Sequence, residues 1–476
     1  MRSPFTASIV SALLGALIVG LGAQLPLVDD SFFWWVPKAM MLADGGGPWV
    51  LAGELPEALR PNARLPPHWA DGLPDYAHPP LWYAWLAGWM HLFGKTHTVV
   101  HLAVLPVAAG IGAGLCQLTY RLGGTRASWA APVLMLLPPV SAQLLRADTD
   151  LPLLLFSTWA LIALLDRKEG LFALLAALAT ASKEPGVLLV VPALAACLWD
   201  RKVRWGWLSP LAILGAWAGI HWLETGGALG GWALSSAEHL PSGPIDWIQD
   251  LGSVLRIALL EQGRWLLWPL ALWSARKGLY RTRELSIAGS HVLTQLLFFG
   301  TLNFLGGIDR VDRYTHVRYL LPGLTTSTSI GLALCPVGAL PLLGTSLFFL
   351  QENSQDGPES SLYGTDTARA LRKARGSLEE LEGDVWVGSH AWAQYTRPYS
   401  GLGSPPLDSL FFYDINTRPE EVSGHVLHAS IGEPLGRLQE LEMTLLREFR
   451  AGRAWARLYR VHEDAQPEEA SSTPAD

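Results

Sequence analysis

The sequence has 476 residues, of which half are hydrophobic and only 16% are charged. An ordinary soluble domain carries about a quarter charged residues, so this composition predicts a protein made mostly of membrane-spanning helices. The net charge of -7 argues against nucleic-acid binding. The three cysteines, Cys116, Cys197 and Cys335, show neither a disulfide framework nor the spacing of metal ligands.

The first apolar run extends from Pro4 to Val28 and is long enough to cross a bilayer, which takes about 20 residues. Small residues near its end resemble a signal-peptide cleavage site, but the run is long for such a signal and many further spans follow. Two adjacent carboxylates, Asp29 and Asp30, come directly after it. They either end the helix at the membrane surface or belong to a functional site.

A long loop, residues 29–97, is expected to follow on the external side. Within it, residues 79–93 are apolar but too short to cross the membrane comfortably. Trp82, Trp85 and Trp89 recur on one helical face, which is typical of a helix that lies in the membrane interface. We therefore expect a juxtamembrane helix here and not a crossing.

Assigning Lys and Arg to the cytoplasm gives a consistent order of about eleven spans, with a cytoplasmic N-terminus, in the plasma (bacterial inner) membrane. After the first span, crossings are expected at residues 98–120, 127–145, 151–165, 170–199, 205–223, 257–273, 285–305, 318–335 and 337–350, with an external loop over residues 225–255. The segment 170–199 is interrupted by Ser182-Lys183-Glu184-Pro185 and fits either one broken span or a hairpin of two. The hairpin is preferred because it keeps Arg201, Lys202 and Arg204 on the cytoplasmic side.

Residues 1–350 are thus predicted to form the membrane module, and the composition changes after Gln351 to that of a soluble domain. Helices are expected at residues 367–375, 391–397 and 434–449, and strands at 384–388, 410–413, 425–429 and 454–461. This alternation predicts a small external α/β domain over residues 351–461. The acidic, Pro- and Ser-containing residues 462–476 are expected to be a disordered tail.

Polar residues from several loops converge on the external side of this topology: Asp29, Asp30, His78, Arg146, Asp148, Asp150, Lys183, Arg313 and Arg318. Each has a structural alternative. Asp148 and Asp150 could cap the next helix, His78 could belong to a helix start with two prolines, and Lys183 could extend to the interface. The gathering of all of them on one side favours a functional site over separate structural roles.

The order of short motifs resembles the polytopic GT-C glycosyltransferases, which include the protein O-mannosyltransferases and the lipid A aminoarabinose transferases. The resemblance covers about residues 5–330. It rests on Asp29-Asp30 after the first span, His78-Pro79-Pro80-Leu81 before a Trp-rich helix, Asp148-Thr149-Asp150, Lys183-Glu184-Pro185 and Arg318-Tyr319-Leu320-Leu321-Pro322. No motif is specific alone, but their order and their common side strengthen the match.

The resemblance implies transfer of a sugar, with inversion, from a polyprenyl-phosphate donor to a hydroxyl of a lipid, glycan or protein acceptor. It makes Asp29 the catalytic base, with Asp30 beside it. A sugar hydroxyl is a poor nucleophile, and a positioned base typically contributes ~10²- to 10⁴-fold. Membrane lipids are the other expected partners, and no nucleic-acid partner is expected.

The leaving lipid phosphate carries charge that cations must stabilise. His78, Lys183, Arg146 and Arg318 are the candidate phosphate-binding residues. Asp148 and Asp150 are candidate ligands for a divalent cation, Mg²⁺ or Mn²⁺, because carboxylate oxygens suit both ions.

The sequence departs from the family pattern at three places. Asp30 stands where Glu is common, and His78 resembles the mannosyltransferase version where the aminoarabinose transferases have Lys. His97 and His101 replace an acid and an arginine after the Trp-rich helix.

The alternative function is a membrane transporter or lipid flippase, but this sequence keeps its charges at span ends and shows no internal repeat. A non-catalytic scaffold that presents the C-terminal domain is a third hypothesis.

Overall fold

The computed structural model describes residues 4–23, 36–43, 78–225, 243–275, 282–301, 317–352, 363–378, 380–381, 383–387, 410–414, 424–430, 442–452 and 454–462. They divide into a helical unit, which ends with the helix at Glu352, and a second unit that begins at Tyr363. Each unit is described by itself.

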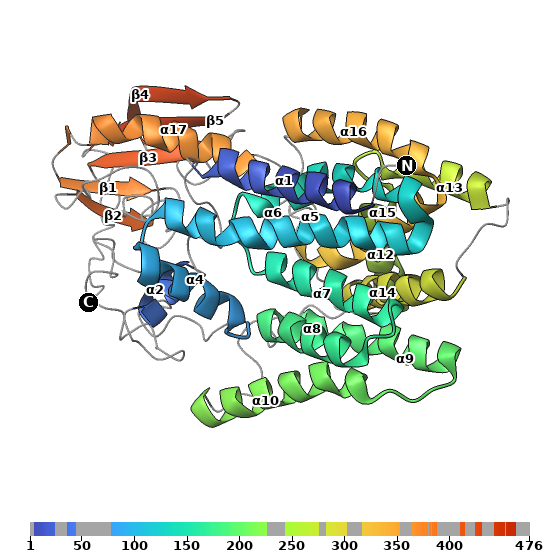
Figure 1. Cartoon of the computed structure of the whole chain (residues 1–476). Coiled ribbons are helices and arrows are strands. Elements are labelled where there is room, and N and C mark those ends of the chain that lie inside the picture. The colour runs from blue at the N-terminus through green and yellow to red at the C-terminus, as the bar shows by residue number, and fades with distance from the viewer. Residues whose placement is uncertain are drawn as a thin grey trace, which may run out of the picture. The chain divides into compact units, whose positions relative to one another are not determined.

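The helical unit contains α1 (Pro4–Gly22), α2 (Val36–Ala43), α4 (Leu81–Phe93), α5 (His97–Ser128), α6 (Pro138–Leu144), α7 (Asp150–Leu165), α8 (Glu169–Ser182), α9 (Val190–Asp200), α10 (Leu208–Thr225), α12 (Pro244–Leu255), α13 (Leu267–Ala275), α14 (Thr282–Thr301), α15 (Leu321–Leu334) and α16 (Ala339–Glu352). Short 3₁₀ segments lie at Ala131–Leu136, Glu184–Leu189, Trp205–Trp207, Arg264–Leu266, Val317–Leu320 and Pro336–Gly338, and a π-helical turn at Arg256–Leu260. Helices α1, α5, α7, α8 and α10 lie side by side in that order (Figure 1).

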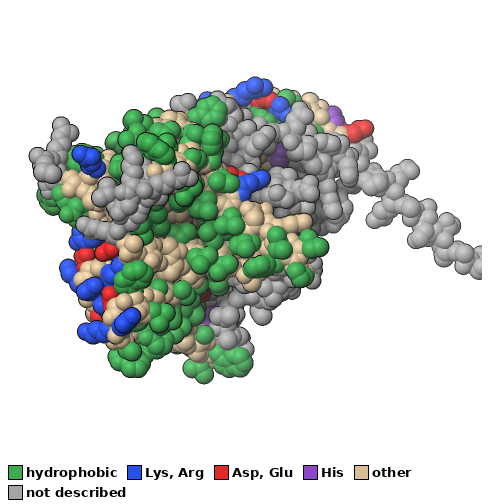
Figure 2. Space-filling model, turned by 90° about the vertical axis from the view of Figure 1, so that its right-hand side faces the viewer, with side chains coloured by type: hydrophobic (Ala, Val, Ile, Leu, Met, Phe, Trp, Pro, Cys, Tyr) green, Lys and Arg blue, Asp and Glu red, His purple; other side chains and the backbone are tan. Residues whose placement is uncertain are grey.

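Large apolar side chains face outward from several of these helices. On α1, Leu13, Leu17 and Leu21 recur at four-residue spacing and are all more than half exposed. Figure 2 shows hydrophobic side chains spread over much of one face. An outward apolar surface of this kind suits a helix bundle in lipid. Within the described residues, α1 and α5 are each long and apolar enough to cross a membrane, so the count of eleven spans stays a prediction.

Helices α1 and α5 approach closely where each carries glycine. A Cβ at Gly112 on α5 would clash with the backbone carbonyl of Ser11, and a Cβ at Gly15 on α1 would meet the carbonyl oxygen of Ala108 at 2.6 Å. Small residues at helix contacts let backbones pack tightly in a lipid environment, where helix association depends on van der Waals contact. These two glycines therefore set the distance between the first two long helices.

The hairpin preferred for residues 170–199 is confirmed. Helix α8 ends at Ser182, the 3₁₀ segment that contains Pro185 reverses the chain, and α9 returns to Asp200. The chain after α9 comes back to the start of α8, where the Gly206 amide donates to Glu169 Oε1 at 3.2 Å.

Two expected spans are not continuous helices, and the expectation was wrong there. Residues 127–145 form a 3₁₀ segment followed by α6, because prolines at 132, 138 and 139 remove backbone donors. Residues 257–273 are interrupted before α13, and Gly263 adopts φ 82°. The Arg264 guanidinium donates to the carbonyls of Ile257 and Ala258 and so satisfies acceptors that an interrupted helix leaves open. The expected loop 225–255 also contains α12.

The second unit is a mixed sheet with one described helix, α17 (Tyr363–Leu378). Its strands are β1 (Gly383–Val387), β2 (Leu410–Asp414), β3 (His425–Ser430), β4 (Met443–Ala451) and β5 (Ala454–Val461), in the order β2-β1-β3-β5-β4. Strand β1 pairs in parallel with β2 and β3, whereas β5 pairs antiparallel with β3 and β4. The expected helix at 367–375 and four expected strands are confirmed.

The helix expected at residues 434–449 is wrong over its second half. Met443–Ala451 is strand β4, which forms a hairpin with β5 through Gly452 at φ 55°. Its Leu, Glu and Arg residues favour a helix intrinsically, but pairing with β5 overrides that preference. The helix expected at 391–397 and the tail at 462–476 lie outside the described residues, apart from His462.

The α1–α5 contact gives a stability prediction. We expect Gly112→Leu to lower the free energy of unfolding by about 1–3 kcal/mol, the usual cost of forcing extra volume into a packed contact. Gly88→Leu is the matched control, because a Cβ at Gly88 on α4 meets nothing within 4 Å. Thermal unfolding of the purified protein in detergent measures both. Equal midpoints for the two variants would contradict the close contact.

Candidate active site

The segment that joins α6 to the first residue of α7, named here the Arg146–Asp150 loop, carries three of the candidate residues, Arg146, Asp148 and Asp150. Ala147 at its centre adopts φ 56°, which is uncommon for a residue other than glycine. The surrounding contacts hold this conformation. Trp82 on α4 donates from Nε1 to the Ala147 carbonyl at 2.9 Å, and Asp148 Oδ1 accepts the amide of Thr149 at 2.7 Å. Helix α4, the expected juxtamembrane helix, thus fixes the shape of this loop.

A buried ion pair joins this loop to the end of α8. Lys183 Nζ lies 2.7 and 2.8 Å from the two oxygens of Asp150, and the side chains are 1% and 0% exposed. Lys183 Nζ also lies 4.2 Å from the centre of the Tyr319 ring, which is within cation–π distance. The lysine therefore does not extend to the interface, which was its structural alternative.

Local sequence explains why Lys183 is available for this contact. Pro185 lacks an amide and cannot continue α8, so the helix ends at Ser182 and Lys183 adopts an extended backbone with φ −161°. Asp150 is the first residue of α7, where a negative charge interacts favourably with the helix dipole. Two helix ends therefore meet at one ion pair.

His78 is connected to the same segment. Its Nδ1 lies 2.8 Å from Glu184 Oε2, directly beside Lys183 in the chain. The His78 side chain is almost fully buried, while that of Glu184 is 22% exposed. Because one ring nitrogen is engaged by the carboxylate, the orientation of the imidazole is fixed.

The structure thus brings together five residues singled out in the sequence: His78, Arg146, Asp148, Asp150 and Lys183. Asp29, Asp30, Arg313 and the side chain of Arg318 lie outside the described residues. Sequence reasoning assigned no role to Glu184, Tyr319 or Trp82. Two of these are immediate neighbours of candidates within the motifs, Glu184 after Lys183 and Tyr319 after Arg318, and that adjacency was the available signal.

The expected divalent cation finds no sufficient ligand set in the part of the chain that is described. No group of three or more His, Cys, Asp or Glu side chains gathers there. Both oxygens of Asp150 accept from Lys183, and Asp148 Oδ1 accepts from Thr149. Asp148 and Asp150 therefore do not fit a metal by themselves, and the cation stays a prediction.

Lys183, Asp150, His78 and Glu184 form an ionic cluster. An apolar cavity of about 180 Å³ lies beside it. Its lining comes from α4, α5, α7 and α8: Leu81, Trp82, Trp85, Pro106, Val107, Pro152, Leu155, Phe156 and Leu178. Trp82 also bonds to the Arg146–Asp150 loop, and Pro152 follows Asp150 by two residues. Buried charges and an apolar cavity thus share the same helices, which suits a ligand with a charged head and an apolar chain.

Comparison with known proteins gives one family match. Residues 77–222 match the family of dolichyl-phosphate-mannose-protein mannosyltransferases. This stretch contains His78, the Arg146–Asp150 loop and Lys183-Glu184. No curated protein matches the chain in sequence.

Two solved structures are similar to the whole chain. ArnT from Cupriavidus metallidurans bound to undecaprenyl phosphate is 14% identical, with a TM-score of 0.54 over 94% of this chain and 96% of that one. The apo form of the same protein is also 14% identical, with a TM-score of 0.49 over 96% and 98%. The first comparison shows the fold. The family match adds a sequence likeness to the mannosyltransferases over residues 77–222.

The buried pair gives a prediction that a double-mutant cycle can test. We expect Asp150→Leu and Lys183→Met each to lower the free energy of unfolding by about 3–5 kcal/mol, because each removes the ion-pair partner of a buried charge. The double variant should be more stable than either single variant. Thermal unfolding in detergent measures all three.

The matched control is the partly exposed pair Arg121–Asp166 at the other end of α7. The equivalent changes there should cost about 0–1 kcal/mol, since exposed pairs contribute little. Additive losses in the Asp150/Lys183 double variant would show that the two side chains do not depend on each other.

Proposed function

We propose that the enzyme transfers a sugar, with inversion, from a polyprenyl-phosphate donor to a hydroxyl of a lipid, glycan or protein acceptor. The observation that carries the proposal is the ionic cluster around Lys183 and Asp150 beside an apolar cavity, both within the residues of the family match. A donor with a phosphate head and an apolar chain requires these two environments side by side. The undecaprenyl phosphate bound to the similar ArnT is a ligand of that chemistry.

The donor phosphate needs more positive charge than the buried pair supplies. Lys183 and Asp150 together are neutral, so a phosphate would be attracted by one and repelled by the other. Arg146, which is 2% exposed in the same loop, is our candidate for the remaining charge, together with Arg318 next to Tyr319. In this proposal Asp150 positions Lys183 and the loop, and the two arginines carry most of the phosphate contact.

His78 is proposed to assist at the same phosphate. Glu184 Oε2 lies 2.8 Å from Nδ1 of the His78 ring and so directs Nε2 of that ring to a fixed place. Glu184 is therefore a positioning residue, and His78 is the group proposed to contact the donor.

Transfer itself is proposed to use Asp29 as the base. As the acceptor oxygen attacks the anomeric carbon, Asp29 takes the hydroxyl proton, the bond between that carbon and the phosphate oxygen breaks, and polyprenyl phosphate leaves. Attack opposite the leaving group inverts the anomeric centre. Asp30 is proposed as a supporting acid. The reaction would take place on the external face, with the N-terminus in the cytoplasm and the second unit outside.

Asp29→Asn tests the assignment of the base. We expect it to lower the rate of transfer from a lipid-linked sugar in proteoliposomes by ~10²-fold or more, because the amide cannot accept the proton. Asp30→Asn is the matched control and should retain most of the activity. Full activity of the Asp29→Asn variant would remove Asp29 from the mechanism, and equal losses in both would remove the distinction between the two acids.

Arg146→Gln tests the phosphate contact. A hydrogen bond to a charged group is worth about 1.5–3 kcal/mol, so we expect the KM for the lipid-linked donor to rise about tenfold or more. Arg146→Lys, which keeps the charge, should restore part of the affinity. Steady-state kinetics with a varied donor concentration measures both.

The control for misfolding is Arg264→Gln, which removes an equally buried arginine that donates to groups within residues 257–262. It should lower the thermal midpoint without changing the KM for the donor. An unchanged KM in Arg146→Gln, or a KM that rises equally in Arg264→Gln, would contradict a phosphate contact at Arg146.

A further inference from the structure

A second ionic site lies at the opposite end of α7 and α8 from the Lys183–Asp150 pair. Helix α7 leads from Asp150 to Leu165, and α8 returns from Glu169 to Ser182, so the connection between them lies one helix length from the pair. The 16 residues of α7 measure about 24 Å. This length approaches the ~30 Å hydrocarbon thickness of a bilayer. A helix of this length would separate the two ionic sites by most of the thickness of a bilayer.

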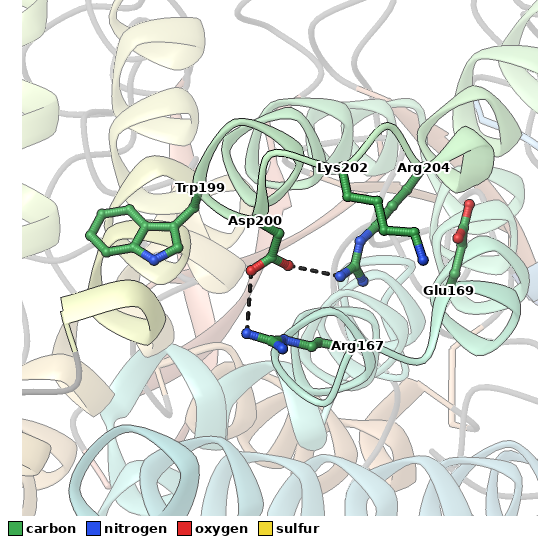
Figure 3. A pocket seen from close by; sticks show the side chains of 6 residues that line it. All are labelled: Arg167, Glu169, Trp199, Asp200, Lys202 and Arg204. Carbon is green, nitrogen blue, oxygen red and sulfur yellow. Dashed lines mark hydrogen bonds and ion pairs between the residues drawn. The ribbon is translucent and has the colours of Figure 1, made fainter.

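This second site is a cavity of about 540 Å³ lined by Arg167, Glu169, Trp199, Asp200, Lys202 and Arg204 (Figure 3). Asp200 is the carboxylate that the neighbouring guanidinium groups contact. Its carboxylate lies 2.7 Å from Arg204 Nη2 and 3.4 Å from Arg167 Nη2, and it accepts from Nε and Nη2 of Arg283 at 2.8 Å each. Three guanidinium groups therefore share one carboxylate.

The charges at this cavity do not balance. Among the lining residues, Arg167, Lys202 and Arg204 supply three positive charges, and Asp200 and Glu169 supply two negative ones, so the lining is positive by one. Lys202 makes no ion pair with a described carboxylate, and the Arg167 side chain is 63% exposed. Within the described chain, the buried Nε of Arg204 has no hydrogen-bond acceptor. A buried donor of this kind requires one.

An apolar groove of about 730 Å³ adjoins the cavity and shares Lys202 with it. Leu194, Leu198, Val203, Trp205 and Trp207 form most of its lining. Leu198 and Trp205 are largely exposed, although both are apolar. In the space-filling view, basic and acidic side chains lie together along one margin of a largely hydrophobic face (Figure 2). One lysine thus stands between a positive cavity and an apolar groove.

We propose that this site binds an anionic phospholipid of the membrane leaflet on the side away from the sugar-transfer site. The lipid phosphate lies in the cavity, where it accepts from Lys202 and Arg204, and an acyl chain lies in the groove beside Trp205. A small soluble anion would account for the cavity but not for the apolar groove that shares its lysine. Basic pockets next to transmembrane helices are suited to anionic headgroups for this reason. The proposal concerns binding alone and does not depend on the donor, the acceptor or the base.

Lipid titration of the delipidated full-length protein in detergent, followed by native mass spectrometry, tests the site. The probes are phosphatidylglycerol and phosphatidylcholine with identical acyl chains. We expect phosphatidylglycerol to bind selectively. The double variant Arg167→Gln/Lys202→Gln should bind it about 25-fold more weakly, since each basic side chain near a membrane surface contributes about fivefold. Both side chains are exposed, so the thermal midpoint should not change.

The control variant Arg126→Gln/Lys168→Gln removes the same charge from exposed residues that do not line the cavity, and it should bind phosphatidylglycerol normally. A second variant, Leu198→Ser, alters only the groove and should weaken phosphatidylglycerol binding as well. Equal weakening in the Arg126/Lys168 control would show a general charge effect and overturn the site. Competition by glycerol 3-phosphate as strong as that of the whole lipid would show a site for soluble anions and overturn the lipid assignment, as would a normal affinity in Leu198→Ser.

Discussion

The helical unit depends on the fact that neither Lys183 nor Asp150 can be buried alone. Both side chains are almost completely removed from solvent, and the desolvation of a single charge costs several kcal/mol. They become compatible with an apolar bundle only as a pair, which requires the start of α7 and the end of α8 to meet. The same requirement places the Arg146–Asp150 loop against α4 through Trp82, and Glu184 against His78. One electrostatic constraint thus brings together three stretches that are far apart in the sequence, residues 78–82, 146–150 and 183–184.

Much of the helical unit could be predicted from hydropathy and proline positions. The hairpin at Pro185 and the short helix α4 follow from span length and helix-breaking residues. Residues 257–273 could not be interpreted correctly, because the interruption depends on Arg264 reaching backbone carbonyls that only the folded chain brings near. The prediction of a helix at strand β4 was wrong for a related reason. Its residues favour a helix, and only its pairing with β5 makes it a strand.

The candidate site was predicted as a set of positions but not as a set of contacts. Charge-based topology gathered His78, Asp148, Asp150 and Lys183 on one side, and the structure brings these residues together. The sequence could not show that Lys183 pairs with Asp150, because separate motifs do not specify which charges meet in the fold. Asp150 was expected as a metal ligand on the strength of its residue type. Its contacts assign it to the lysine, which shifts the proposed phosphate contacts toward the arginines.

The two ends of α7 and α8 use charge in opposite ways. At one end the charges of Lys183 and Asp150 are buried and balanced, and at the other, open end, where Arg167 is exposed, the cavity lining is positive by one. Two unit charges about 25 Å apart interact by only about 0.7 kcal/mol at an effective dielectric constant of ~20, and salt reduces this further. An anionic lipid at the open end would therefore hardly change the electrostatics of the transfer site. Any influence of that lipid on sugar transfer has to pass through the packing of α7 and α8, whose shared connection holds both ends in register.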